Sequence, residues 1–210
     1  MFITFEGIDL SGKSTQCKLL KEYLMGKGYD VILLREPGGT DISERIREVL
    51  LDRKSDGIVP LAEFFLYSAA RAQLVEQIIR PALAEGKVVI CDRYDDSSTA
   101  YQGFARGLGV EKIENINEIA TGNLIPDLTF FIDISVEESL KRLKVAGKLQ
   151  DRMEAEGRKF FNLVRDGYLQ LATKHNDSEK GRFKTLNGTD DIGTIQRRIR
   201  DIVNRRLGLT

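Results

Sequence analysis

The pattern G-x-x-x-x-G-K-S at residues 7–14 constrains this chain more than any other feature. It follows the apolar run Phe2–Glu6 and precedes a helical pattern from about Ser14 to Lys27. Glycines let the backbone close around an anion with its N–H groups pointing inward, and the start of the helix adds a positive dipole end. The pattern predicts a nucleotide phosphate loop, and the alternative is a glycine-rich turn that only joins strand to helix. The residues assigned to the loop are Gly7, Ile8, Asp9, Leu10, Ser11, Gly12, Lys13, Ser14 and Thr15.

Two side chains of this pattern carry specific chemistry. Lys13 has the length and charge to reach the β- and γ-phosphates of a bound nucleotide, and the hydroxyl of Ser14 is a ligand for Mg²⁺. The chain lacks the N-K-x-D motif with which switch GTPases read guanine. The sequence therefore favours an enzyme that uses ATP over a regulatory switch.

Short apolar runs alternate with longer helical patterns along the chain. Such alternation requires crossover connections, which give a mostly parallel sheet with helices on both faces. We therefore predict one α/β domain over residues 1–210, with three layers and five strands. The expected strands are Phe2–Glu6, Val31–Arg35, Val88–Asp92, Thr129–Asp133 and a weak one near Phe183–Leu186.

The helical patterns also carry boundary and burial signals. We expect helices from about Asp41 to Leu51, from Pro60 to about Glu85 with an interruption at Pro81, and after the capping pattern that begins at Ser135. The long pattern predicts buried side chains at Leu61, Phe64, Phe65, Val75, Ile78, Ile79 and Leu83. The last helix is expected to carry Ile192, Ile195, Ile199, Ile202 and Val203 on one side.

Composition excludes several classes of protein. The 32 basic residues balance 32 acidic ones, which argues against a nucleic-acid partner. A single histidine, His175, makes a histidine-rich metal site or a histidine triad improbable, and we expect it at the surface. Cys17 and Cys91 are expected to be buried thiols, which suits a reducing compartment. With no membrane-spanning run and no secretory signal, we predict a cytoplasmic protein without a membrane partner.

The segment VVICDRYDDSSTAYQGFAR, residues 88–106, suggests a second phosphate site. A buried strand ends in Asp92-Arg93, and neighbouring residues at a strand end point to opposite sides. Asp92 can therefore serve Mg²⁺, directly or through water, while the planar guanidinium of Arg93 grips a phosphate. The alternative is a local ion pair at the surface.

At this point the chain resembles the thymidylate kinase family. The resemblance rests on FEGIDLSGKSTQ at the start, REPGGT at residues 35–40 and DRYDDSSTAYQG at residues 92–103, with FFLYSAAR and IPDLTFFIDI in support. It implies the P-loop NTPase fold, a Mg²⁺-dependent transfer from ATP to dTMP that yields dTDP, and a homodimer. Two rival functions stay open, namely another nucleoside monophosphate or deoxynucleoside kinase, and an ATP-binding regulatory protein without transfer activity.

The resemblance also implies roles for individual residues in the dTMP site. Arg93 matches the arginine that holds the dTMP phosphate, and Tyr67 and Arg71 match residues that stack on thymine and read its carbonyl. The i,i+4 spacing of Tyr67 and Arg71 places ring and guanidinium on one helical face. Without the resemblance, Tyr67 would equally be a core aromatic residue.

Five further positions are assigned to the same site. Tyr101 resembles the tyrosine beneath the sugar, and Gln102 is its neighbour in the same block. Asp9 matches an acidic residue near the sugar 3′-hydroxyl, and otherwise it is a solvated loop carboxylate. Ser98 either contacts the base or caps a helix. Arg47 either adds a second grip on the phosphate or lies on a solvated helix face.

The polar segment from about residue 144 to 159 is expected to form a short mobile lid. Leu10 stands where one subgroup of the family carries a P-loop arginine, so this chain resembles the subgroup whose lid supplies the cations. Arg152 is the residue predicted to reach the transferred phosphate, with Lys148 as the second choice. The alternative for this segment is a solvated charged loop. No general base is expected, because a phosphate monoester is already largely ionised at neutral pH.

Overall fold

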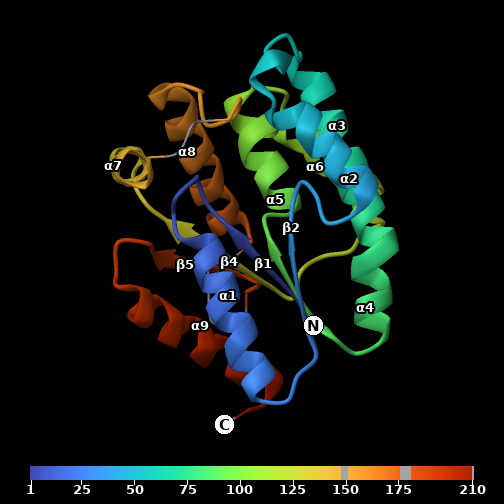
Figure 1. The fold of residues 1–210 in the computed structure, drawn as a ribbon, viewed down its shortest axis with the longest axis vertical. Helices are drawn as coiled ribbons and strands as arrows, with labels where there is room; N and C mark the ends of the chain where they lie inside the picture. Colours follow the sequence, from blue (N-terminus) through green and yellow to red (C-terminus); the bar gives the residue numbers. More distant parts are fainter. Residues whose placement is uncertain (148–150, 176–180, 210) are drawn as a thin grey trace.

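The computed structural model describes residues 1–147, 151–175 and 181–209. Its centre is a parallel sheet in the order β2-β3-β1-β4-β5, which confirms the predicted five-stranded α/β architecture (Figure 1). The strands are β1 (Phe2–Glu6), β2 (Val31–Arg35), β3 (Val88–Asp92), β4 (Leu128–Asp133) and β5 (Phe183–Asn187).

Helices cover both faces of this sheet. On one face lie α1 (Lys13–Gly26) and α9 (Ile192–Leu207), which are side by side in Figure 1. The other face is covered by α3 (Pro60–Leu74), α4 (Arg80–Ala84) and α8 (Arg158–Lys174). The remaining helices are α2 (Asp41–Leu51), α5 (Asp95–Ser98), α6 (Val110–Thr121) and α7 (Val136–Ala146), with a 3-10 turn at Arg53–Ser55. No helix in these described ranges is both long and apolar enough to cross a bilayer.

The strands are apolar on both sides because each face packs on helices. Ile3 and Phe5 of β1 lie in the core beneath α1 and α9, together with Ile195 and Ile199. Phe131 of β4 points to the opposite face, where its ring stacks on Tyr168 of α8 at 5.1 Å between centroids. Alternation of side chains along each strand thus builds two cores at once.

The long helical pattern after Pro60 behaves differently from the prediction. It consists of α3, a π-helical segment at Val75–Ile79 and α4, which Pro81 helps to begin. Phe64, Val75 and Ile79 are fully buried, but the predicted burial of Leu61 and Phe65 is wrong, because these side chains are 42% and 50% exposed. They point away from the buried stripe of α3. Ile192, which was predicted only to share one side of the last helix with Ile195 and Ile199, is 58% exposed at the start of α9.

The carboxyl ends of the strands meet at one edge of the sheet. Arg35 at the end of β2 pairs in register with Asp92 of β3, and Asp92 pairs with Phe5 of β1. The loops that follow β1, β2 and β3 carry the FEGIDLSGKS, REPGGT and DRYDDSS blocks. Three motifs that are far apart in the sequence therefore come together at this edge, which is where open α/β sheets bind ligands.

Candidate active site

The loop between β1 and α1 has the conformation of a phosphate-binding loop. Gly7 and Gly12 adopt φ angles of 137° and 106°, and a β-carbon on Gly7 would lie 2.5 Å from the carbonyl oxygen of Ile132. Only glycine fits there. The Lys13 ammonium donates hydrogen bonds to the carbonyl oxygens of Gly7 at 3.0 Å and Ile8 at 2.9 Å. The loop thus curls around its own lysine and holds the positive charge at the phosphate site.

Ser14 and Asp92 meet beside this loop. The Ser14 hydroxyl donates a short hydrogen bond to a carboxylate oxygen of Asp92. Mg²⁺ prefers oxygen ligands and is commonly held by one or two protein groups together with substrate phosphates and water. A hydroxyl at the start of α1 and a carboxylate at the end of β3, facing each other, match this donor set, so the residues present fit a magnesium ion.

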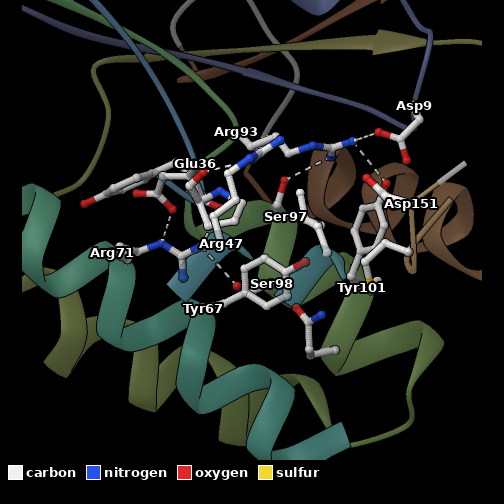
Figure 2. Close-up of a pocket in the computed structure, with 15 residues that line it drawn as sticks. Asp9, Glu36, Arg47, Tyr67, Arg71, Arg93, Ser97, Ser98, Tyr101 and Asp151 are labelled. Carbon is white, nitrogen blue, oxygen red and sulfur yellow. Dashed lines mark hydrogen bonds and ion pairs between the residues drawn. The ribbon is translucent and has the colours of Figure 1, made fainter. Parts of the chain in front are cut away.

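Two cavities adjoin at the site. A cavity of about 530 Å³ lies against the phosphate loop and is lined by residues that include Lys13, Ser14, Asp92 and Arg142. A second one lies between α3 and the turn that follows β3, and Figure 2 shows the residues that line it. The residues that line both cavities are Asp9, Glu36, Arg47 and Arg93. A ligand in one cavity can therefore approach a ligand in the other across these four side chains.

Arg93 stands at the junction of the two cavities. Its Nη2 donates to Asp9 at 2.5 Å and to the Tyr101 hydroxyl at 3.2 Å, while its Nη1 donates to the Gly7 carbonyl at 3.0 Å (Figure 2). Burial alone would raise the pKa of Asp9, but the charges of Arg93 and Lys13 outweigh burial and lower it. Asp9 is therefore a paired carboxylate, in contrast to the solvated loop carboxylate of the alternative interpretation.

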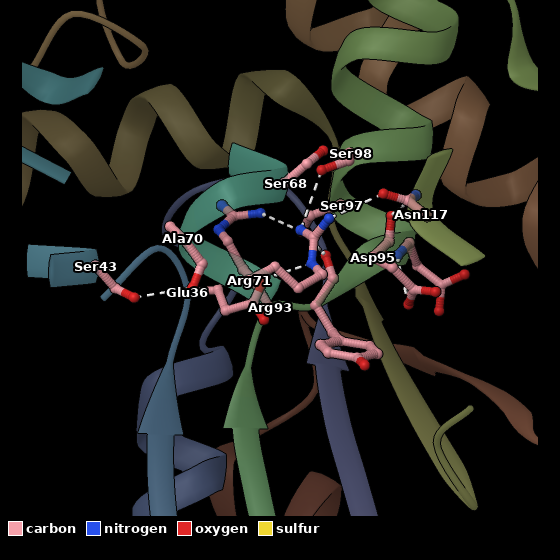
Figure 3. Close-up of polar contacts among 12 residues, drawn as sticks. Glu36, Ser43, Ser68, Ala70, Arg71, Arg93, Asp95, Ser97, Ser98 and Asn117 are labelled. Atoms are coloured by element: carbon pink, nitrogen blue, oxygen red, sulfur yellow. Dashed lines mark hydrogen bonds and ion pairs between the residues drawn. The ribbon is translucent and has the colours of Figure 1, made fainter. Parts of the chain in front are cut away.

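Arg71 is held by four hydrogen bonds to the protein (Figure 3). The donors are Nε to Glu36 at 2.7 Å, Nη1 to the side chain of Asn117 at 3.0 Å, and Nη2 to the Tyr94 carbonyl and the Ser98 hydroxyl, both at 3.0 Å. A guanidinium has five N–H groups. One N–H on Nη1 therefore has no acceptor among the described residues, and it belongs to a side chain that lines the second cavity.

The other residues assigned to dTMP line the same cavity. Tyr67, one helical turn before Arg71, lies in this cavity with Ser98, Tyr101 and Gln102. Ser98 does not cap α5, which has no side-chain cap, so its hydroxyl is free to serve the cavity and Arg71. Tyr101 and Gln102 belong to a π-helical segment, Thr99–Ala105, that the sequence analysis did not predict. Segments of this kind occur often at functional sites, where they redirect side chains.

Arg47 also lines both cavities and is half-buried. Its Nη1 donates to the carbonyl oxygen of Pro37 at 2.9 Å. Burial and the nearby charge of Arg35 lower its pKa. A guanidinium held in this position faces the site, which disfavours the interpretation of Arg47 as part of a solvated helix face.

Arg152, the residue predicted to reach the transferred phosphate, is engaged by other residues of the protein. This side chain is 8% exposed, and its Nη2 forms an ion pair with Glu63 of α3 at 2.7 Å. Its Nε donates to the Leu50 carbonyl at 2.7 Å, and it does not line the cavity at the phosphate loop. Arg152 thus fastens the segment after residue 150 to α2 and α3. Burial would raise the pKa of Glu63, but the hydrogen bonds and charges of Arg106 and Arg152 lower it. Lys148 lies outside the described residues.

Two residues at the site were missed by the sequence analysis. Arg142 of α7 lines the cavity at the phosphate loop and donates to the carbonyl oxygens of Leu10 at 3.2 Å and Ser11 at 3.4 Å. Glu36 lies within the REPGGT block, which carried the resemblance, and burial raises its pKa against the effect of Arg71. Its Oε1 is buried and accepts no hydrogen bond within the described part of the chain. A basic residue in the middle of a polar helix would not by itself have signalled a role for Arg142.

The residues expected to have no role lie away from this site. Cys17 and Cys91 are buried free thiols, as predicted. His175 stacks on Phe183 at 6.2 Å and lines a separate polar depression. Burial and the charge of Arg182 lower the pKa of His175.

Comparison with known proteins gives a consistent family. The family model described as thymidylate kinase matches residues 5–199. A thymidylate kinase of Caldanaerobacter subterraneus subsp. tengcongensis is 50% identical over 198 residues, covering 94% of this chain and 92% of the relative. One of Thermoanaerobacter sp. (strain X514) is 47% identical over 207 residues, covering 98% of each.

A solved structure agrees with these relatives. The crystal structure of thymidylate kinase from Ehrlichia chaffeensis superposes with a TM-score of 0.77 at 35% sequence identity, covering 97% of this chain and 98% of that one. Fold, motifs and overall sequence therefore point the same way: this chain belongs to the thymidylate kinase family, and it is a kinase that phosphorylates dTMP with ATP and Mg²⁺.

Proposed function

We propose that dTMP occupies the cavity between α3 and Arg93, and that ATP places its phosphates in the cavity at the phosphate loop. The observation that carries this assignment is the position of Arg93, which lines both cavities. A guanidinium there can hold the dTMP phosphate while the γ-phosphate of ATP lies next to it. In-line transfer requires that juxtaposition.

The roles of the individual residues follow from this placement. Lys13 and the loop amides hold the β- and γ-phosphates, and Ser14 with Asp92 holds Mg²⁺, which when bound neutralises charge on those phosphates. Tyr67 stacks on the thymine, and the remaining Nη1 hydrogen of Arg71 donates to a thymine carbonyl. Arg142 replaces Arg152 as the further cation beside the phosphate loop, since it lines that cavity.

The remaining residues are assigned to the sugar, the acceptor phosphate and the base. Tyr101 and Asp9 lie next to Arg93, where a sugar attached to the bound phosphate would pass. Arg47 supplies a second cation for the phosphate, and Ser98 and Gln102 face the base. The phosphate oxygens of dTMP are already largely ionised at neutral pH. The transfer therefore requires fixed cations and does not require a residue that accepts a proton.

A coupled assay of ADP release tests the assignment of the acceptor. With ATP and Mg²⁺ present, we expect turnover with dTMP at least a hundredfold above that with AMP or GMP, because Tyr67, Arg71 and Ser98 surround the base with groups suited to a pyrimidine carbonyl edge. Thymidine, which has no phosphate for Arg93, should give no measurable turnover. A preference for thymidine or for a purine nucleotide would contradict the assignment.

The pKa of Lys13 predicts a pH dependence. Burial and repulsion by Arg93 lower this pKa to about 8. Below pH 8 the ammonium is charged and attracts the phosphates of ATP, and above pH 8 it loses its proton in the free enzyme. We therefore expect kcat/KM for ATP, measured from pH 6.5 to 9.5 with dTMP well below its KM, to fall above pH 8 towards tenfold per unit. In Lys13→Arg, which stays charged, the fall should be absent, whereas a flat profile in the unchanged enzyme would refute this role.

We further propose that the chain is a homodimer that associates through α2 and α3. Apolar side chains are exposed on these helices at i,i+7 and i,i+4 spacings, which place them on common faces. They are Ile42 (52%), Val49 (48%), Leu61 (42%) and Phe65 (50%). A second copy of the same surface would cover them, which is the association that the family resemblance implies.

Sedimentation velocity tests this surface. At about 10 µM we expect the unchanged chain to sediment as a dimer and Phe65→Asp as a monomer, because a carboxylate buried in the interface would be left without a partner. Ile192→Asp is the matched control, since Ile192 is equally exposed but lies on α9. A monomeric unchanged chain, or a dimeric Phe65→Asp, would rule out this interface.

We also propose that residues 1–210 act as a single nucleoside monophosphate kinase domain in the cytoplasm. Support for one domain comes from the continuous sheet, whose strands are drawn from both ends of the chain. The two buried free thiols suit a reducing compartment.

A further inference from the structure

Glu6 is a fully buried carboxylate to which the residue roles above give no task. It is the last residue of β1, directly before the phosphate loop, and it is 0% exposed. Three groups donate hydrogen bonds to it, namely the backbone amide of Tyr94 at 2.7 Å, the Ser97 hydroxyl at 2.5 Å and the Tyr168 hydroxyl at 2.9 Å. Burial of a carboxyl group destabilises the fold unless its oxygens accept hydrogen bonds. The three donors around Glu6 therefore stabilise its buried position.

The two hydroxyls of this cluster also reach Arg93. Nη1 of Arg93 lies 3.3 Å from the Ser97 oxygen and 3.4 Å from the Tyr168 oxygen, and these two oxygens are 2.9 Å apart. Figure 2 shows Ser97 beside the guanidinium of Arg93. Glu6 therefore stands one hydroxyl behind the guanidinium and is linked to it by hydrogen bonds through Ser97 and Tyr168.

The backbone of Arg93 is held by the same carboxylate. Arg93 adopts a φ of 75°, a left-handed conformation that an arginine rarely takes. The next amide, that of Tyr94, donates to Oε1 of Glu6, and the Arg93 amide donates to the Phe5 carbonyl at 2.9 Å. Both peptide groups that flank the left-handed residue are thus tied to the end of β1. Strained backbone of this kind persists only where surrounding contacts determine it.

We propose that Glu6, acting through Ser97 and Tyr168, is the positioning residue that aims Arg93 at the acceptor phosphate. The inference rests on the proposed role of Arg93 in binding dTMP. The network joins three parts of the chain that are distant in sequence, since Tyr168 belongs to α8 and lies 162 positions from Glu6. Each member satisfies a buried polar group of another, and the network meets the proposed dTMP cavity through Arg93, Ser97 and Tyr94, beside Asp9 and Tyr101.

Removal of the Tyr168 hydroxyl is the most selective test. Tyr168→Phe keeps the ring stacked on Phe131, so the core stays filled, and the melting temperature should fall by only about 2–4 °C. We expect kcat/KM for dTMP to fall about tenfold while KM for ATP changes less than twofold. Tyr23→Phe is the matched control, because it removes a tyrosine hydroxyl that bonds to Asn204 at 3.0 Å on the α1–α9 face. Ser97→Ala should reproduce the loss, and unchanged dTMP kinetics in both Tyr168→Phe and Ser97→Ala would overturn the proposal.

A double-mutant cycle shows whether Tyr168 acts through Arg93. The dissociation constant of dTMP is measured by calorimetry for the unchanged enzyme, Tyr168→Phe, Arg93→Ala and the double variant. If the hydroxyl positions the guanidinium, Tyr168→Phe weakens dTMP binding about tenfold with Arg93 present and less than twofold without it. Equal losses in both backgrounds would overturn the inference and leave the role of Arg93 intact. Unchanged dTMP binding in Arg93→Ala would instead overturn the proposed function.

Discussion

Arg93→Ala is expected to lower kcat/KM for dTMP about a thousandfold. The guanidinium is the cation between the two cavities, and two charge-assisted hydrogen bonds to a phosphate, at about 2 kcal/mol each, correspond to roughly that factor. Most of the loss should appear as a raised KM for dTMP, with KM for ATP changed less than threefold. Initial rates over a matrix of both substrates measure the two constants separately.

The backbone conformation at Arg93 does not complicate this substitution. The left-handed φ of 75° is about as unfavourable for alanine as for arginine, so the change removes the guanidinium without altering backbone strain. Arg197→Ala, at an exposed arginine on α9, is the control for loss of a positive charge. Equal effects of the two substitutions, or a loss confined to ATP, would show that Arg93 does not hold the acceptor phosphate.

Lys13→Ala is expected to lower kcat about 10²–10³-fold. Its ammonium is held at the phosphate loop by the Gly7 and Ile8 carbonyls, where charge builds up as the γ-phosphoryl group leaves ATP. Removal of one preorganised donor from such a position typically costs a factor of this size. Because the donor acts on the transferred group, kcat should fall more than the affinity for dTMP.

Single-turnover rates at saturating ATP and dTMP separate chemistry from binding for this variant. Lys18→Ala is the matched control, since Lys18 is exposed on the same helix and lies one turn further from the loop. Near-normal single-turnover rates in Lys13→Ala would contradict a role in the transfer step. A loss seen equally in Lys18→Ala would indicate damage to α1 and not to the loop.

The sequence was most informative where local chemistry alone decides structure. The strands Phe2–Glu6, Val31–Arg35 and Val88–Asp92 form with the predicted bounds, because buried parallel strands are continuous apolar runs with clear ends. The phosphate loop was predicted equally well, because its conformation requires glycine at a fixed position. Gly7 indeed has no space for a β-carbon. The strand end at Asp92-Arg93 suggested a second phosphate site, but its assignment to dTMP required the family resemblance, because only the fold brings Arg93 beside Asp9 and Tyr101.

The sequence was least informative where distant contacts decide. Phe64 and Phe65 are chemically identical neighbours, yet one is buried and the other half-exposed, because successive helix positions point about 100° apart. Arg152 and Arg142 carry the same charge, and their local sequence patterns do not distinguish them. In the structure, Arg152 pairs with Glu63, whereas Arg142 donates to the phosphate loop. The two π-helical segments also depend on packing rather than on a sequence signal.

The four bonds that hold Arg71 have a consequence for inhibitor design. An arginine side chain loses about 1.5–2 kcal/mol of rotamer freedom when it is ordered, and here that loss occurs during folding and not on ligand binding. A rigid carbonyl that reaches the remaining Nη1 hydrogen therefore gains its hydrogen bond at little entropic cost. Glu36 already compensates the guanidinium charge, so an anionic group at this position would be repelled where a neutral acceptor is favoured.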